Sequence, residues 1–185
     1  MTIFESASKP KAMFQDWDPR YPEVVGSLLS ILVHLPVGIE IEHVGSTAVP
    51  GCGGKGIIDL LAIYPDGALD ETNASLLSLG LSRQGPEFAR AWPETRPMYL
   101  GWYRYFGEPF MVYVHVVPLV SDEVRRFRDF RNLLRDSPDL VVEYCNLKRQ
   151  ILSAGILDTD EYAVRKRPFM RRALGSRHAL KAEDA

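Results

Sequence analysis

Apolar side chains near the N-terminus recur at helical spacing and soon afterwards alternate with polar ones. Residues 22–34 begin with Pro22 and carry an apolar stripe, which predicts a helix that ends before Pro36. Residues 39–44, IEIEHV, alternate between apolar and polar, as a strand with one buried face does. Residues 57–63, IIDLLAI, are almost entirely apolar and predict a strand in the interior of a sheet.

Further along, the pattern predicts a hairpin and then a run of helices. Residues 69–79 read as a short helix closed by Gly80. Residues 97–105 and 110–117 predict a hairpin joined by Phe106-Gly107-Glu108-Pro109, so that four or five strands are available. After Pro118 three helices are expected: 122–135 capped by Ser121, 138–153 begun by Ser137-Pro138, and one begun by Asp158 or Thr159.

This order of elements predicts a single α+β domain over residues 1–185, with a small mixed sheet covered by helices and a C-terminal helical segment from about 121. With 185 residues, 46% of them hydrophobic, the chain can bury a sizeable core. It has neither a secretory signal nor a run of about 18 apolar residues, so we predict a cytoplasmic protein without a membrane partner. Cys52 and Cys145 show no metal-ligand spacing, and we expect free thiols.

Basic residues are concentrated in the C-terminal third. Of the 22 lysines and arginines, 14 lie in residues 121–181, although the net charge of the chain is −2. Groups such as Arg125, Arg126, Arg128 and 165–167 would attract phosphate-rich ligands, RNA included, if they shared one face. The alternative is a solvated helix surface.

Asp59 is the only polar side chain between Ile57 and Ile63. A buried carboxylate is costly, so a cation, hydrogen bonds or a shifted pKa must compensate it. Because a glycine-rich loop precedes it, we favour a metal-binding or catalytic role. The alternative is a carboxylate that accepts backbone N–H groups at the end of the strand.

The loop over residues 45–56, GSTAVPGCGGKG, contains five glycines between the two predicted strands. Small residues let backbone N–H groups surround an anion such as a triphosphate, and Ser46, Thr47 and Lys55 add hydroxyls and a cation. The loop matches neither the P-loop, since Gly56 follows Lys55, nor G-x-G-x-x-G. A glycine-rich loop can also be only a turn.

Gly45-Ser46 after one strand and Asp59 on the next resemble the nucleotidyltransferase superfamily. More closely, the chain resembles the GrpB family, an uncharacterised protein family, between residues 42 and 169. The segments that carry this resemblance are EHVGSTAVPG, KGIID, YVHVV, FRNLLRDSP, EYCNLK and EYAVRKRPF.

The resemblance implies a nucleotidyltransferase-like fold in which Gly45 and Ser46 hold nucleotide phosphates and Asp59 binds Mg²⁺. Ile57 stands where the superfamily has its first metal-binding Asp, and Asn132 replaces an acid common in the family. The leading hypothesis is Mg²⁺-dependent transfer of a nucleotidyl group from a nucleoside triphosphate to a hydroxyl or amine of a small-molecule acceptor. The alternative is a non-catalytic module that binds a nucleotide or another phosphate ligand, and nucleic acid is a less favoured partner.

Other residues extend this candidate site. Glu42 is our choice as second metal ligand, although it can be a strand-surface carboxylate, and His115 is either a base or phosphate contact or a core residue. Arg104, Arg131 and Lys148, which match family positions, are assigned with Thr47 and Lys55 to phosphate binding. Lys166 matches a family position too, and helical spacing does not decide which of these cations face the ligand. Trp17, Trp92 and Trp102 are interpreted as core or cleft-wall aromatics.

Overall fold

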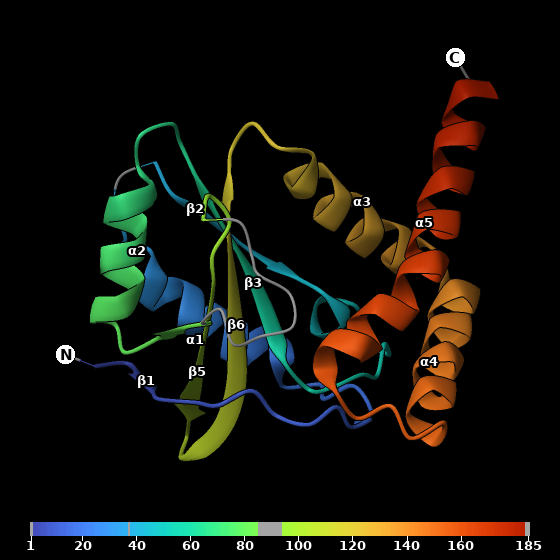
Figure 1. Ribbon diagram of the computed structural model, residues 1–185, viewed down its shortest axis with the longest axis horizontal. Helices are drawn as coiled ribbons and strands as arrows, with labels where there is room; N and C mark the ends of the chain where they lie inside the picture. Colours follow the sequence, from blue (N-terminus) through green and yellow to red (C-terminus); the bar gives the residue numbers. More distant parts are fainter. Residues whose placement is uncertain (1, 37, 85–93, 184–185) are drawn as a thin grey trace.

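Six strands form one sheet in the part of the chain that the computed structural model describes, residues 2–36, 38–84 and 94–183, with 176–183 described by their backbone alone. The order is β1-β5-β6-β3-β2, and β4 pairs with β5 (Figure 1). Only the pairing of β3 with β6 is parallel. The strands are β1 Phe4–Glu5, β2 Glu40–Val44, β3 Ile58–Tyr64, β4 Ser82–Arg83, β5 Met98–Tyr105 and β6 Glu108–Pro118.

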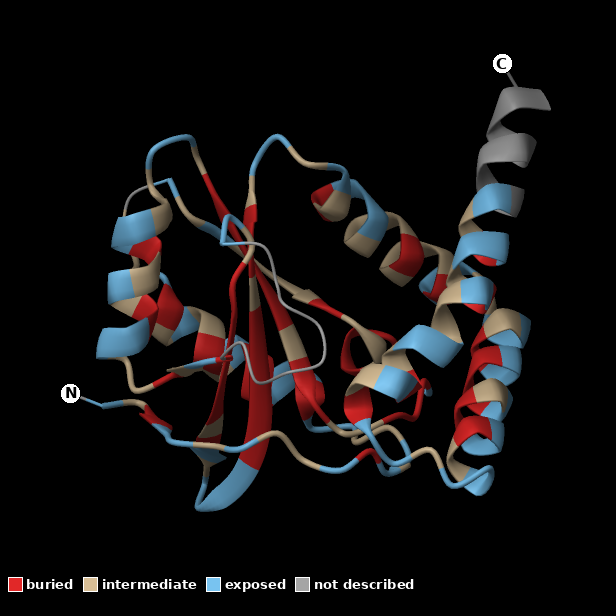
Figure 2. Ribbon diagram, viewed as in Figure 1, coloured by how far each residue is buried: buried red, intermediate tan, exposed pale blue. Residues whose placement is uncertain are grey.

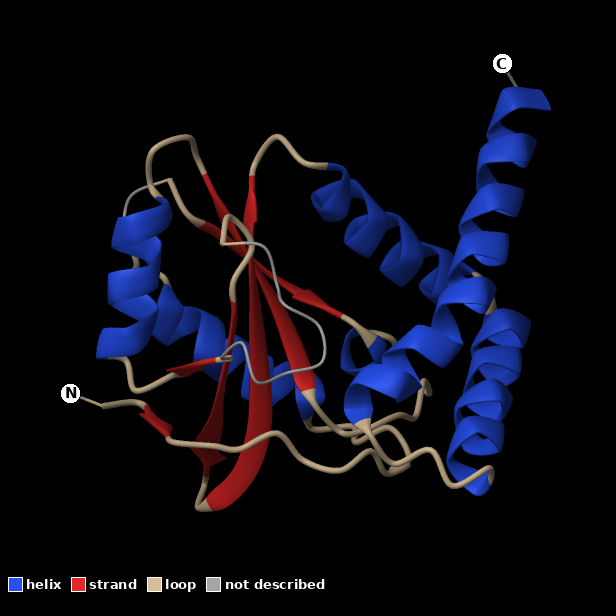
Figure 3. Cartoon of the chain, viewed as in Figure 1, coloured by secondary structure: helices blue, strands red, loops and turns tan. Residues whose placement is uncertain are grey.

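Helices cover both faces of this sheet. One group lies on one side and a second group on the other, as Figures 1 and 3 show. The first pair is α1 Tyr21–Leu32 and α2 Leu69–Ser78; the second group is α3 Asp122–Asp136, α4 Pro138–Ser153 and α5 Thr159–Glu183. The expectation of an α+β fold with a mixed sheet is therefore confirmed, and the predicted helices lie within two residues of their observed bounds where both ends were predicted.

The interior strand β3 is buried on both sides (Figure 2). Leu60 and Ala62 point to the face covered by α1 and α2, where they join the largest apolar cluster with Leu28. Leu61 and Ile63 point to the other face and pack against Val124 of α3, among others. By the alternation of strand side chains, Asp59 lies on this second face, which explains a carboxylate inside an apolar run.

The hairpin between β5 and β6 is tighter than predicted. Its turn consists of Phe106 and Gly107 alone, both with positive φ (+48° and +85°), as two-residue hairpin turns require. Glu108 and Pro109, expected in the turn, belong to β6. The two-residue strands β1 and β4 were not predicted, because such short segments carry no measurable alternation.

The helix starts agree with the sequence at α5 and differ at α3. Asp158 accepts hydrogen bonds from the backbone N–H groups of Asp160 (3.0 Å) and Glu161 (2.9 Å), so it caps α5 as predicted. Ser121 occupies the capping position of α3, but its hydroxyl makes no capping hydrogen bond. The predicted capping role of Ser121 is therefore wrong.

The described residues bear on the membrane and on the two cysteines. Among the described helices none is both long and apolar enough to cross a membrane. Cys52 and Cys145 are free and buried, as expected.

Candidate functional site

The turn after β2 packs directly on the carboxylate of Asp59. Val44, the last residue of β2, pairs with Asp59 in the sheet, and Gly45 then turns the chain with φ +73° into a short 3-10 helix, η1 Ser46–Ala48. A Cβ atom at Gly45 would lie only 2.4 Å from Oδ2 of Asp59. The sequence pairing of Gly45-Ser46 with Asp59 is thus a physical contact, which only a residue without a side chain permits.

Thr47 stabilises this turn from within. Its hydroxyl donates to the carbonyl of Ile57 (3.3 Å) and lies 2.9 Å from Nε2 of His43. The indole N–H of Trp17 donates to the Thr47 carbonyl at 3.0 Å. Because the Thr47 side chain is buried and hydrogen-bonded, it serves the shape of the turn, and Trp17 supports the turn from outside.

His115 is the hydrogen-bonding partner of Asp59. Nε2 of His115 lies 3.3 Å from Oδ1 of Asp59, and its ring packs against Phe127 of α3. Burial raises the pKa of Asp59, but the hydrogen bond with His115 and the nearby charges of His115, Lys55 and Lys166 outweigh burial, so the pKa lies below its ordinary value. The carboxylate is ionised at neutral pH, and its side chain remains 28% exposed.

A small cavity opens beside Asp59. It encloses about 30 Å³, room for about two water-sized groups, and α5 supplies one wall. A small ion or part of one phosphate group fits there, whereas a whole triphosphate does not. The lining residues are Ser46, Thr47, Lys55, Gly56, Ile57, Asp59, Tyr162 and Lys166.

Three lysines surround this cavity or support its wall. Lys55 and Lys166 line it and lie 5.9 Å and 4.6 Å from the centre of the Tyr162 ring. Burial lowers the pKa of both, and repulsion from Lys55 and Lys148 helps to bring the pKa of Lys166 to about 7. Lys148, 1% exposed, donates to the Gly53 carbonyl and to the Ser46 hydroxyl (3.3 Å).

Glu42 lies on the same sheet face as Asp59 but in a different environment. Nε of Arg128 donates to one oxygen of Glu42 at 2.6 Å, and Arg131 donates to the other at 3.0 Å and to the His43 carbonyl at 2.9 Å. Among the described residues no group of three or more His, Cys, Asp or Glu side chains is placed to hold a metal. A metal-binding role for Glu42 stays a prediction, and its two arginine partners oppose it.

Some of the remaining predicted residues lie near the cavity beside Asp59, and others lie far from it. Arg131 holds Glu42, and Arg104 lies beside the hairpin turn, where it pairs with Glu5 (2.6 Å) away from the cavity. Trp102 is partly buried against the apolar cluster on the β5–β6 hairpin, and Trp92 lies outside the described residues.

Tyr162 was not singled out from the sequence; the only signal was the segment EYAVRKRPF, and spacing alone could not place it beside a loop more than a hundred residues earlier.

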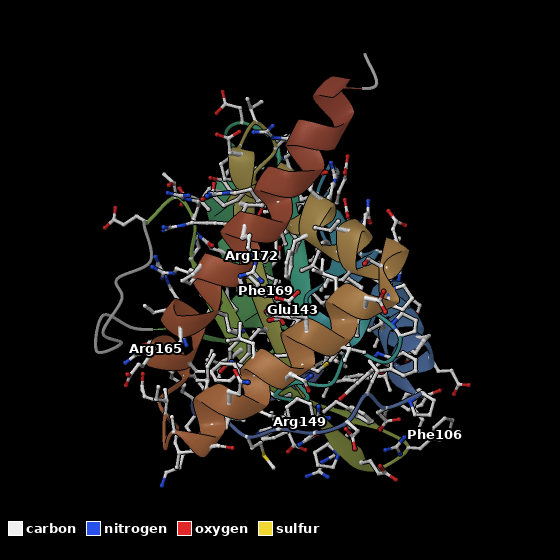
Figure 4. All side chains as sticks on the ribbon, turned by 90° about the vertical axis from the view of Figure 1, so that its right-hand side faces the viewer. Phe106, Glu143, Arg149, Arg165, Phe169 and Arg172 are labelled. Carbon is white, nitrogen blue, oxygen red and sulfur yellow. The ribbon has the colours of Figure 1, made fainter. Side chains whose placement is uncertain are left out.

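A second hollow, of about 470 Å³, lies between α4 and α5. Figure 4 shows its charged side chains, and Arg172 of α5 pairs there with Glu143 of α4. Arg165 pairs with Glu161 on its own helix at 3.0 Å. Several arginines of α3 are paired with acids in the same way, which favours the interpretation of the basic helices as a solvated, charge-compensated surface.

The sequence profile of the GrpB protein family matches residues 11–176. The chain belongs to the GrpB family. A UPF0157 protein of Pseudomonas aeruginosa is 33% identical over 162 residues, which cover 85% of this chain and 64% of the relative, less than two thirds of its length. A UPF0157 protein of Halalkalibacterium halodurans is 29% identical over 154 residues, covering 80% of this chain and 73% of the relative.

The crystal structure of the conserved protein GrpB from Enterococcus faecalis has the same fold. It superimposes with a TM-score of 0.67 at 22% identity, covering 89% of this chain and 98% of that chain. The structure of Cid1 in complex with its short product ApU aligns at a TM-score of 0.47 and 16% identity, over 72% of this chain and 40% of that chain. A likeness at that level carries no conclusion about function.

The contact between Gly45 and Asp59 generates a prediction with a matched control. Gly51 has nearly the same φ (+75°) but open space where a Cβ would lie. We expect Gly51→Ala to lose about 1–2 kcal/mol of unfolding free energy through backbone strain alone. Gly45→Ala should lose about 1–3 kcal/mol more, because its Cβ meets the carboxylate. Urea unfolding measures both, and equal losses would contradict the contact.

His43 generates a prediction about pH. Burial, opposed by the charge of Asp59 and assisted by the charges of Arg135 and Arg131, lowers the pKa of His43 to about 4, so the folded protein keeps this imidazole neutral. The unfolded chain takes up the proton near pH 6.5. Stability is therefore full above that pH and declines as the pH falls toward 4, by at most about 1.4 kcal/mol per pH unit from this group. Urea unfolding across this range should show a shallower decline for His43→Gln, and parallel curves for both proteins would refute this assignment.

Proposed function

We propose that this GrpB protein binds the phosphate groups of a nucleoside triphosphate at the cavity beside Gly45. One observation carries the proposal: the cavity is lined by two lysines, Lys55 and Lys166, and by a serine that follows a glycine turn, against a single carboxylate. Such a set of cations and hydroxyls attracts anions with oxygen acceptors. A cytoplasmic location, where nucleotides are available, remains part of this proposal.

The size of the cavity limits how the ligand can sit. With about 30 Å³ enclosed, one phosphate group can reach toward Ser46 while the rest of the nucleotide stays outside. Tyr162 and Lys166 of α5 form the wall that a larger ligand would have to displace. The bound phosphate would therefore be a terminal one, and the base would contribute little to binding inside the cavity.

Nucleotidyl transfer to a hydroxyl or amine of a small-molecule acceptor is the second candidate. The contact of Asp59 with the Gly45 turn favours it, because this arrangement is the one on which the superfamily resemblance rests. The hydroxyl or amine would attack the α-phosphorus, and pyrophosphate would leave. Nε2–H of His115 donates to Asp59, so His115 would take the proton of the attacking group at Nδ1, and the lysines would neutralise charge on the phosphates.

The Mg²⁺ that the resemblance implies fits these residues poorly. A two-ion phosphoryl-transfer site needs several carboxylates, but among the described residues Asp59 is the one carboxylate that lines the cavity, and Glu42 is held by two arginines. The two lysines would also repel a cation. In this candidate the transfer therefore depends on the chain's own residues.

The binding proposal is tested by calorimetry of the purified protein with ATP, GTP, CTP and UTP. We expect Lys55→Met to weaken binding at least about tenfold, or about 1.4 kcal/mol, because a cation at the phosphate is lost. Lys11→Met, which removes an exposed lysine of equal charge outside the cavity, should bind as the natural protein does. Equal affinity for all three proteins would refute the proposed position of the phosphate.

The transfer candidate is tested by pyrophosphate release from the four triphosphates with a panel of hydroxyl and amine acceptors, with and without Mg²⁺. Asp59→Asn should reduce turnover at least about a hundredfold, since His115 loses the group that orients it. If the natural protein binds nucleotide tightly but mass spectrometry detects no product, the non-catalytic function stands. Full turnover in Asp59→Asn would eliminate the mechanism.

A further inference from the structure

We infer that a phosphate group seated partly in the cavity is held by the ammonium groups of Lys55 and Lys166 and needs no divalent metal ion there. This inference rests on the proposed function and deepens it. It names the source of the positive charge and the class of ligand: a terminal phosphate of a diphosphate or triphosphate chain.

The first support for this inference is the set of charges around the cavity. Lys55 and Lys166 line it from the loop and from α5, whereas Asp59 is the only acid among the described residues of its lining. Ile57, which occupies the place of a second carboxylate in the superfamily pattern, presents an apolar side chain there. A divalent cation would meet two lysines and one carboxylate. A phosphate would favour the protonated form of Lys166, whose pKa lies at about 7, and would then meet two cations.

The second support for the inference is a pair of buried hydroxyl groups without hydrogen-bond partners among the described residues. Tyr162, only 1% exposed, lines the cavity, and within the described residues its hydroxyl has no hydrogen-bond partner. The hydroxyl of Tyr113, the sheet neighbour of Asp59, lacks one too, and Lys55 lies 5.4 Å from the centre of that ring. Buried hydroxyls are normally satisfied, so the Tyr162 donor in the cavity wall points to a ligand rich in oxygen acceptors, and Tyr113, which is not in the lining, lies next to Asp59 in the sheet.

The hydroxyl of Ser46 is a further donor for a bound ligand, because its role in the hydrogen bond with Lys148 is that of acceptor. Lysine can only donate, so the Ser46 hydroxyl accepts from Lys148, which leaves its own hydrogen available for another acceptor. Lys148 is itself anchored by the Gly53 carbonyl and buried. Lys148 therefore acts as a positioning residue that aims Ser46 toward the cavity, and it does not line the cavity itself.

Asp59 then has opposite effects under the two kinds of binding. If a metal bridges the carboxylate and the phosphate, removing the charge of Asp59 weakens binding. If the lysines bind the phosphate directly, the ionised carboxylate repels it. Burial lowers the pKa of Lys55 and of Lys166 and the charge of Asp59 opposes this lowering, so the comparison is made in a buffer acidic enough to keep both lysines protonated without Asp59, and there removing this charge strengthens binding. The sign of the change separates the two without any measurement of activity.

The experiment is calorimetry of the full chain with inorganic pyrophosphate and with ATP, each in EDTA and in excess Mg²⁺, at about pH 6, where Lys166 is protonated and Asp59 is still ionised. We expect binding in EDTA, several-fold tighter binding by Asp59→Asn, and at least about tenfold weaker binding by Lys166→Met. Lys166→Arg should retain most of the affinity. Arg165→Met, which removes a neighbouring charge on α5 that lies outside the cavity lining, should leave affinity unchanged.

Each other outcome overturns a specific statement. Binding that requires Mg²⁺ and disappears in Asp59→Asn overturns this inference and leaves the proposed function intact. Absence of binding to either probe in both buffers overturns both. If circular dichroism shows that Lys166→Met does not fold, Lys55→Met takes its place, and unchanged affinity in that variant in EDTA also counts against the inference.

Discussion

The site depends on the close packing of the Gly45 backbone on the carboxylate of Asp59. Strand pairing places Val44 opposite Asp59, and the chain must turn at the next residue with positive φ. A side chain at that position would overlap the carboxylate, so the residue must be glycine. The turn then places the backbone of Gly45 and the hydroxyl of the next residue, Ser46, close to the fixed negative charge of Asp59. The charge must then be balanced, and His115 and Lys55 are the groups the fold supplies for this purpose.

Much of this could be predicted from the sequence, because strong local signals carried it. The apolar run around Asp59, the alternation in residues 39–44 and the turn at Gly45 are local patterns, and they predicted the two strands and their loop correctly. The contribution of α5 could not be predicted, because Tyr162 and Lys166 approach Asp59 only through the packing of three helices on the sheet. Arg104 and Arg131 failed to reach the cavity for a related reason: each has a nearby carboxylate, Glu5 or Glu42, that holds it elsewhere.

Glu42 and Asp59 lie on the same face of the sheet but have different partners. Glu42 lies at register with Leu61, next to α3, and receives arginines whose planar groups bind both of its oxygens. Asp59, nearer the loop, receives a histidine and lysines, which are compact and leave space beside them. Arginine thus joins α3 to β2 as a structural contact, whereas the lysines surround a cavity.

The different partners explain why Glu42 has a structural role while Asp59, on the same sheet face, lies in the proposed binding site. A half-buried ion pair with both oxygens engaged is costly to break, so Glu42 and Arg131 are more useful for holding α3 than for binding a ligand that comes and goes. Lys55 and Lys166 contact the Tyr162 ring and share the charge of Asp59, but no ion pair holds either of them in the part of the chain that the structure describes. A compact ammonium can exchange one oxygen ligand for another at little structural cost. An exchangeable positive charge next to a rigid glycine turn is what a phosphate ligand needs, and the fold places it on the one sheet face where a helix from the C-terminal segment can close over it.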